Sequence, residues 1–255
     1  MLANEDALLY VGAGRPSVPI VDAAFAPWDT LRVQSADTVP VLVLEARHPT
    51  SVLWAIYLHG AGSQIGSAST AYRVRLLRDA GLNVLAVEYR GYGFSREHTL
   101  TEDGLYADAR AGWNYLRDVR GVPRDRIAIW GYSLGGSVAT HLAVAVAPAA
   151  LITEATGISV RSIGHQRYPW LTGSVFMRNR FDNLSRASKL HLPWLLYHGE
   201  ADEIVPFSHA EQLVSKAPQA RLVRLQANHL GVEGADSTKA FDALRAFVNG
   251  AFPVR

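Results

Sequence analysis

Three side chains that can cooperate in cleaving an acyl bond occur along the chain in the order serine, aspartate, histidine. Ser133 is the centre of a Gly-x-Ser-x-Gly pentapeptide at residues 131–135, and Asp202 and His229 each follow a short apolar segment. A serine hydroxyl is a weak nucleophile at neutral pH, so it needs a neighbouring base that a third group orients. We therefore predict that His229 takes the Ser133 proton and returns it to the leaving group, while Asp202 fixes the imidazole tautomer.

The pentapeptide lies where a strand should run directly into a helix. Arg126–Trp130 is an apolar strand candidate, and Leu134–Val146 is an apolar helix candidate. A serine at such a junction sits on a tight turn that exposes its hydroxyl above the sheet. Gly131 and Gly135 are required there, because side chains would collide where the strand folds back on the helix. This context, more than the common pentapeptide itself, predicts a nucleophile.

A tetrahedral oxyanion would be held by two backbone N–H groups. The first is expected at Leu134, directly after the nucleophile at a helix N-terminus. The second is expected from the loop after the strand candidate Leu53–Leu58, where Ala61 follows His59 and a glycine. Small residues let the backbone approach a substrate, so we assign Ala61 to this role, with Gly62 as the neighbouring alternative.

Other acids and histidines compete for the same roles. Glu154, at the end of the strand after the elbow helix, is the main rival acid to Asp202, and Glu200 and Glu203 are weaker rivals. His59 and His198 are expected to be buried hydrogen-bonding residues. His229 alone follows the last strand, which favours it as the base.

Strands and helices alternate along the chain. The further strand candidates are Val39–Ala46, Leu82–Glu88, Ala150–Glu154, Pro193–His198 and Leu222–Leu225. The further helix candidates are Thr70–Ala80, a helix after a Thr101 N-cap, Ser208–Lys216 with a Ser208/Glu211 capping box, and a helix from Asp236. Strands apolar on both faces indicate an α/β fold with a mostly parallel central sheet covered by helices on both faces. We predict one domain over residues 1–255.

The segment at residues 156–191 breaks this alternation. It is rich in Arg, Tyr, Trp, Gly and Asn and shows no regular period. A long insertion of this kind in a compact domain is usually functional, so we expect a small cap over the site. Its aromatic residues Tyr168, Trp170 and Phe176 line an acyl pocket or simply pack the cap, since pockets and cores use the same residue types.

Five motifs follow one another along the chain: His59-Gly-Ala-Gly62, Glu88-Tyr-Arg-Gly-Tyr-Gly-Phe-Ser95, Gly131-Tyr-Ser-Leu-Gly-Gly136, His198-Gly-Glu-Ala-Asp-Glu-Ile-Val-Pro206 and Asn228-His229. Together these motifs resemble the α/β-hydrolase-fold serine hydrolases, and in particular the bud-emergence-type branch related to α/β-hydrolase-domain lipid and thioester hydrolases. The resemblance covers roughly residue 29 to the C-terminus, and Glu88 stands where the branch usually has Asp. It implies an α/β-hydrolase fold, in which the order Ser-Asp-His is the usual one.

Composition excludes several other function classes. The chain has no cysteine, which rules out disulfides, thiolate chemistry and cysteine-ligated metals. No His, Asp or Glu cluster has metal-ligand spacing, so we predict neither a metal nor a cofactor. The net charge is only +2 and the basic residues are scattered, which does not suggest a nucleic-acid partner. The oligomeric state is not determined by the sequence.

The N-terminal residues show no secretory signal, and no apolar run is long enough to span a bilayer. A cytoplasmic location is therefore the default expectation, with a leader or anchor outside the given chain left open.

We predict a cofactor-independent serine hydrolase that cleaves carboxylic esters through an acyl-serine intermediate. The modest cap suggests small or medium acyl chains. The family resemblance keeps acyl-thioester cleavage, as in a depalmitoylase, as the runner-up. Peptidase action ranks third: prolyl-oligopeptidase-type hydrolase domains have similar motifs, but the sequence shows no separate substrate-gating domain. A non-catalytic binder on the same fold is the non-enzyme alternative.

Overall fold

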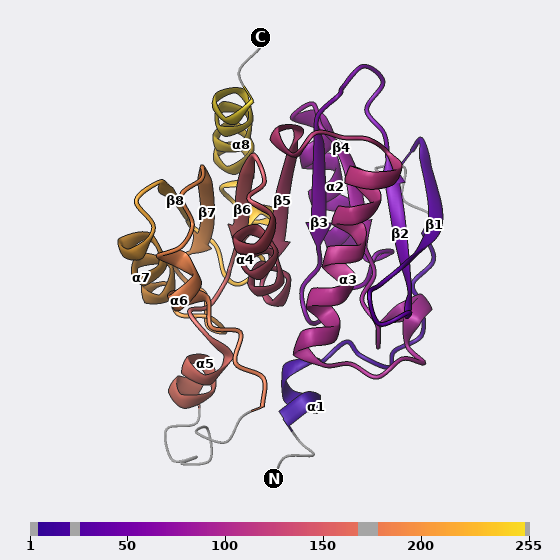
Figure 1. Cartoon of the computed structure of the whole chain (residues 1–255). Coiled ribbons are helices and arrows are strands. Elements are labelled where there is room, and N and C mark those ends of the chain that lie inside the picture. The colour runs from indigo at the N-terminus through magenta and orange to yellow at the C-terminus, as the bar shows by residue number, and fades with distance from the viewer. Residues whose placement is uncertain (1–4, 21–25, 168–177, 253–255) are drawn as a thin grey trace.

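The computed structural model describes residues 5–20, 26–167 and 178–252. Its centre is one eight-stranded sheet with the order β1-β2-β4-β3-β5-β6-β7-β8 (Figure 1). The strands are β1 (Trp28–Gln34), β2 (Pro40–Ala46), β3 (Trp54–Leu58), β4 (Asn83–Val87), β5 (Ile127–Tyr132), β6 (Ala150–Glu154), β7 (Trp194–Gly199) and β8 (Ala220–Leu225).

The strands from β4 to β8 in this order run parallel, and β2 and β1 continue the sheet antiparallel to their neighbours. Every residue of β3, β4, β5, β6 and β7 is buried. A strand buried on both faces has to be apolar throughout, which is why these segments could be recognised as short continuous apolar runs. The prediction of a mostly parallel sheet is confirmed.

Helices cover both faces of the sheet (Figure 1). One face packs against α3 (Glu102–Asn114), α4 (Leu134–Val146) and α7 (Ser208–Lys216). The other face packs against α2 (Ala68–Asp79) and α8 (Ser237–Ala251). Side chains of β5 alternate between these two cores, because successive residues of a strand point to opposite faces. The layered α/β prediction is therefore confirmed.

Local sequence signals predicted the N-terminal cap of α3 correctly and that of α7 incorrectly. Thr101 caps α3 as expected, since its side chain accepts a hydrogen bond from the N–H of Gly104 at 3.0 Å. The predicted Ser208/Glu211 capping box is wrong. The chain is already helical at Phe207, the N-cap residue of α7, which makes no side-chain cap bond. Backbone carbonyls preceding the helix satisfy its first N–H groups, and Glu211 instead pairs with Arg224.

Residues between β6 and β7 leave the sheet and return to it. This stretch includes α5 (Val160–Arg167) and α6 (Asn183–Ala187). The N-terminal helix α1 (Glu5–Leu9) lies near its return: the Glu5 carboxylate accepts hydrogen bonds from the backbone N–H groups of Arg178 and Asn179. None of the helices in the described ranges has both the length and the apolar character to cross a bilayer.

Candidate active site

Ser133 occupies a strained turn between β5 and α4. Its backbone has φ 52° and ψ −114°, a conformation that a non-glycine residue rarely adopts. A Cβ on Gly131 would lie 2.1 Å from the carbonyl oxygen of Gly135, and a Cβ on Gly135 would lie 2.0 Å from that of Leu58. Only glycine fits at either position, because backbone atoms stand where a side chain would begin. The strand–turn–helix context predicted from the pentapeptide is present.

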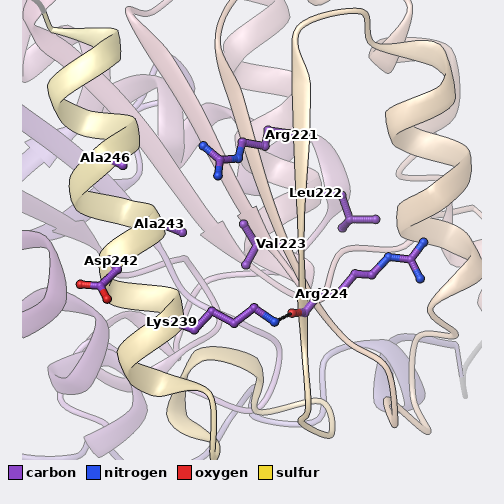
Figure 2. Close-up of a pocket in the computed structure, with 8 residues that line it drawn as sticks. All are labelled: Arg221, Leu222, Val223, Arg224, Lys239, Asp242, Ala243 and Ala246. Atoms are coloured by element: carbon purple, nitrogen blue, oxygen red, sulfur yellow. Dashed lines mark hydrogen bonds between the residues drawn. The ribbon is translucent and has the colours of Figure 1, made fainter.

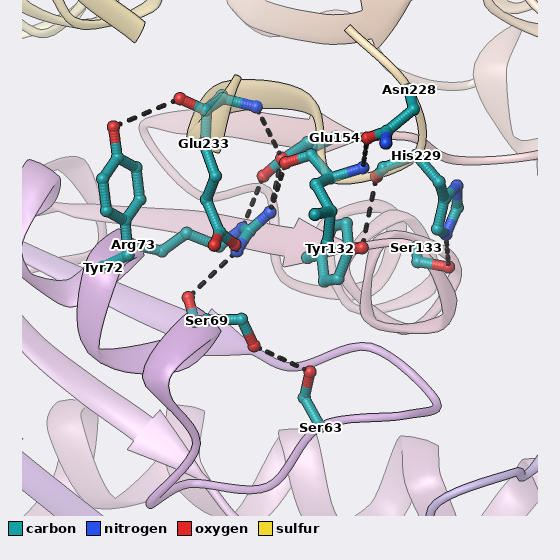
Figure 3. Close-up of polar contacts among 12 residues, drawn as sticks. Ser63, Ser69, Tyr72, Arg73, Tyr132, Ser133, Glu154, Asn228, His229 and Glu233 are labelled. Atoms are coloured by element: carbon teal, nitrogen blue, oxygen red, sulfur yellow. Dashed lines mark hydrogen bonds and ion pairs between the residues drawn. The ribbon is translucent and has the colours of Figure 1, made fainter. Parts of the chain in front are cut away.

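The structure brings Ser133, His229 and Asp202 together, although they come from three separate loops. His229 Nε2 lies 3.0 Å from Ser133 Oγ, and His229 Nδ1 lies 2.8 Å from Asp202 Oδ2. Figure 3 shows the imidazole directed at the serine hydroxyl. The Asp202 side chain is buried, whereas that of His229 is 15% exposed. Solvent therefore reaches the histidine but not the carboxylate that contacts it.

Asp202 is held as a carboxylate by several donors. Burial alone would raise its pKa, but the hydrogen bond from His229 and two backbone N–H groups outweigh this effect and lower the pKa below its ordinary value. The N–H groups of Ile204 and Val205 donate to Oδ1 at 2.9 and 2.8 Å. With Oδ1 fixed by the backbone, Oδ2 is left directed at the imidazole.

The competing histidines make other contacts. His59 is buried beside Glu88, with its Nε2 3.1 Å from a carboxylate oxygen of that residue. His198 Nε2 lies 2.8 Å from the carbonyl oxygen of Val205 and 3.4 Å from Asp202 Oδ2. Both are buried hydrogen-bonding residues, as predicted, and His198 additionally borders the carboxylate that orients His229.

The rival acids lie in other interactions. The Glu154 carboxylate forms a bidentate ion pair with Arg73, at 2.7 Å to Nε and 2.6 Å to Nη2. Glu200 is exposed and accepts a hydrogen bond from Gln226, and Glu203 is also exposed. Among these carboxylates it is Asp202 that contacts a ring nitrogen of His229.

The two backbone positions expected to bind an oxyanion lie on neighbouring segments. Leu134 is the first residue of α4, where helix N–H groups lack intrahelical partners. The loop that carries Ala61 packs on the elbow, since a Cβ on Gly60 would lie 2.8 Å from the ring of Tyr132. The Ala61 carbonyl accepts a hydrogen bond from the N–H of Gly12 at 2.8 Å, which links this loop to the N-terminal segment.

Comparison with known proteins decides the family. The sequence model of the prolyl oligopeptidase family matches residues 68–253. The chain belongs to this family. It is an α/β-hydrolase-fold hydrolase, as the motifs indicated.

Relatives of this prolyl oligopeptidase family member include an uncharacterized protein of Mycobacterium tuberculosis strain H37Rv. The two are 37% identical over 174 residues, which cover 68% of this chain and 62% of the relative. Alpha/beta hydrolase domain-containing protein 17B of Homo sapiens is 29% identical over 187 residues, covering 73% of this chain and 61% of the relative. The matched part is therefore less than two thirds of the length of these curated relatives.

Solved structures share the fold at lower sequence identity. An esterase of Pyrococcus furiosus superposes with a TM-score of 0.76 at 20% identity, over 92% of this chain and 98% of that one. An α/β serine hydrolase without lid from Xanthomonas campestris superposes with a TM-score of 0.68 at 21% identity, over 94% of this chain and 100% of that one. A puromycin-hydrolyzing peptidase of Mycobacterium tuberculosis gives 0.70 at 18% identity, over 92% of this chain and 41% of that one. These likenesses establish the α/β-hydrolase fold.

The expected pocket aromatics Tyr168, Trp170 and Phe176 lie outside the described residues, so their role stays a prediction. Within the described ranges, no group of three or more His, Asp or Glu side chains is placed to hold a metal ion.

A separate hollow lies between β8 and α8 (Figure 2), and it contains none of the proposed site residues. Two of the residues that line it are joined by a hydrogen bond of 2.6 Å, from Lys239 Nζ to the carbonyl oxygen of Arg224. It is lined by Arg221, Leu222, Val223, Arg224, Lys239, Asp242, Ala243 and Ala246.

Sequence reasoning did not single out Arg73, which lies close to the site. One signal was available. Arg73 falls on the same stripe of its helix as Thr70, Val74 and Leu77, all of which are buried. A lone arginine within a buried stripe must meet a carboxylate or several carbonyls inside the protein, because an unpaired buried charge is too costly.

Proposed function

We propose that this protein is a serine hydrolase that cleaves carboxylic esters of small or medium acyl chains through an acyl-Ser133 intermediate. The observation that carries the proposal is the chain of contacts from Ser133 Oγ through His229 to Asp202, at 3.0 and 2.8 Å. Both distances are within the range expected for a nucleophile, its base and the orienting acid.

Each residue has one role in the proposed cycle. His229 accepts the proton of Ser133 as the oxygen attacks the acyl carbon, and Asp202 stabilises the imidazolium. His229 then gives that proton to the leaving alcohol. In the second half of the cycle His229 takes a proton from a water molecule as that water attacks the acyl-enzyme. His229 then returns the proton to Ser133 Oγ, which releases the carboxylic acid product and regenerates Ser133.

The N–H groups of Leu134 and Ala61 are proposed to bind the oxyanion in both halves of the cycle. Their positions support this role, since α4 begins at Leu134 and the Ala61 loop packs against the elbow. Loss of one such donor typically costs about 3–4 kcal/mol of transition-state stabilisation.

We also propose that residues 1–255 form a single hydrolase domain with residues 156–191 as a small cap. Support comes from the sheet: β6 and β7 are adjacent parallel strands of one continuous sheet, so the intervening segment leaves at the carboxyl end of β6 and re-enters at the amino end of β7. In parallel sheets the carboxyl ends carry the ligand site.

A fluorophosphonate probe tests the nucleophile directly. Wild-type protein should be labelled on Ser133, and Ser133→Ala should not be labelled. If the wild type is not labelled, the catalytic proposal fails and a non-catalytic binder becomes the better interpretation. If both proteins are labelled equally, the probe reacts at another residue and Ser133 is not the nucleophile.

Membership in the prolyl oligopeptidase family favours peptidase action as a second candidate, and acyl-thioester cleavage also stays open. A panel of p-nitrophenyl esters of graded chain length, acyl-thioesters and peptide p-nitroanilides separates the three. Fastest turnover of short or medium esters supports our first choice. Negligible ester turnover beside rapid thioester or anilide cleavage would replace it.

A further inference from the structure

The loop that carries His229 rests on a buried charged cluster. The loop runs from the end of β8 into a short 3-10 turn at Gly231–Glu233. Figure 3 shows Arg73 and Glu154 beneath this loop, with hydrogen bonds to several of its backbone groups. These two residues come from α2 and β6, elements far from the loop in sequence.

Arg73 uses its guanidinium to join the loop to the fold. Its side chain is fully buried, and Nη2 donates both to Glu154, at 2.6 Å, and to the carbonyl oxygen of Leu230, at 3.1 Å. Nη1 donates to the carbonyl oxygen of Ser69 at 2.9 Å and forms an ion pair with Glu233. Arg73 therefore contacts the loop on both sides of Gly231.

Glu154 connects the same loop to the nucleophile. Its carboxylate accepts a hydrogen bond from the N–H of Val232 at 3.0 Å, while its backbone carbonyl accepts one from the N–H of Ser133 at 2.8 Å. Gly231, with φ 58°, packs directly on the carboxylate, since a Cβ there would lie 2.4 Å from Glu154 Oε1. One residue thus fixes the backbone of both the proposed nucleophile and the histidine loop.

Tyr132 completes the cluster from the strand end next to Ser133. The Arg73 guanidinium lies over its ring at 3.9 Å from the centroid, a cation–π arrangement. Its hydroxyl donates to the carbonyl oxygen of His229 at 3.2 Å. The backbone of the proposed base is therefore tied to the residue adjacent to the proposed nucleophile.

We infer that Arg73 and Glu154 are positioning residues, whose ion pair holds the His229 loop at the distance from Ser133 that proton transfer needs. The inference rests on the proposed function, because positioning has a kinetic meaning only if Ser133 is acylated. Neither residue touches the reacting atoms. They act through the backbone of Leu230 and Val232 and through Glu233.

A role in geometry fits the physics of a buried ion pair better than a role in stability. Desolvating two charges offsets most of their mutual attraction, so such pairs often add little net stability. They do demand a single arrangement of donors and acceptors. A displacement of about 1 Å at a catalytic group can cost about 100-fold in rate, so a rigid support for the loop has a large kinetic value.

The test uses Arg73→Lys and the double variant Arg73→Met/Glu154→Gln. The double variant removes both fully buried charges, and Glu233, which loses Arg73 as its partner, is 23% exposed to water, so the variant is expected to fold. Arg73→Lys keeps the charge while losing the forked donor geometry. With p-nitrophenyl acetate we expect kcat to fall about 100-fold in the double variant and about 10-fold in Arg73→Lys, with KM changed less than about threefold. Hydrogen exchange followed by mass spectrometry should show faster exchange in the peptide that covers residues 226–236.

Arg120→Met is the matched control. Arg120 pairs with the buried carboxylate of Glu45 in β2, which β4 and β3 separate from β5. This variant should lower the thermal midpoint while keeping kcat within about twofold and leaving exchange of the 226–236 peptide unchanged.

Folded Arg73 variants with kcat within about twofold of wild type and unchanged exchange at residues 226–236 would overturn the inference. If the double variant does not fold, Arg73→Lys alone decides by the same two measurements. If the wild type has no activity and no probe labelling, the proposed function fails, and the exchange data still decide whether Arg73 and Glu154 hold the loop.

Discussion

Ser133 and Glu154 are joined through the main chain, because the N–H of Ser133 donates a hydrogen bond of 2.8 Å to the carbonyl of Glu154. The bond continues the pairing of β5 with β6, whose last register pair is Tyr132 with Glu154. A strained backbone conformation persists only where its surroundings over-determine it. Here the sheet itself holds the turn on which the proposed nucleophile sits.

The substitution Asp202→Asn should lower kcat by about 10⁴-fold, because an amide donates to Nδ1 and leaves the imidazole in the wrong tautomer. Circular dichroism and thermal melting should show an intact fold. Ester turnover measures the effect, with Glu154→Gln as the comparison. We expect a much smaller loss in Glu154→Gln. Near-normal turnover of Asp202→Asn beside a large loss in Glu154→Gln would show that Glu154, at the end of β6, is the orienting acid.

Gly60→Ala should reduce kcat with little change in KM. The new Cβ would lie 2.8 Å from the Tyr132 ring, so the loop that carries Ala61 must shift away from the elbow. A shift of about 1 Å in an oxyanion donor predicts a loss of about 100-fold. Steady-state kinetics on a short p-nitrophenyl ester gives both constants. Unchanged kcat in a folded variant would contradict the assignment of the Ala61 N–H as an oxyanion donor.

Gly131→Ala should destabilise the fold severely, by about 3 kcal/mol or more, because its Cβ would overlap the backbone of Gly135. Gly250→Ala is the control, since a Cβ there meets no atom within 4 Å in the exposed part of α8. Because glycine destabilises a helix relative to alanine, Gly250→Ala should raise the free energy of unfolding by up to about 0.5–1 kcal/mol. Urea unfolding curves compare the two. Equal midpoints would show that the elbow tolerates a side chain.

Stability should fall between neutral and acid pH partly because of His209. Burial lowers the pKa of this fully buried side chain from 6.5 to about 4. The unfolded chain therefore binds a proton at a higher pH than the folded chain, so stability is lost as the pH falls from about 6.5 towards 4.

His209→Asn removes this titration while its side-chain oxygen can still accept the hydrogen bond that the N–H of Ile158 donates to Nδ1 at 3.4 Å. Thermal midpoints between pH 7 and 4.5 should decline less steeply in the variant than in the wild type. Identical slopes would show that His209 is not a source of the acid sensitivity.

Local sequence patterns predicted the elements that position the site. Leu134–Val146 and Ala150–Glu154 occur in the structure with the same bounds. Both are mainly apolar segments bounded by clear turn signals, and most of their residues are buried, which made their type and their ends recognisable. The tight glycine-flanked turn between β5 and α4 followed from steric reasoning alone.

Long-range polar contacts and edge strands left weaker signals. Strand β1 was not predicted, because as an edge strand it mixes exposed and half-buried residues and has no apolar run. Glu154 was recognised only as a rival acid. Its real partner, Arg73, lies far away in sequence, and no local period connects a helix residue with a strand end.

The turn at Ser133 has a consequence for anyone who needs an inactive form of this protein. A residue at φ 52° and ψ −114° carries about 1–3 kcal/mol of backbone strain, which glycine would not feel. Ser133→Gly should therefore yield a protein that is both inert and more heat-resistant than its parent. Such a variant would be suitable for crystallising the protein with an uncleaved substrate. Its gain in the free energy of unfolding would measure how much stability the protein loses by having a serine at this turn.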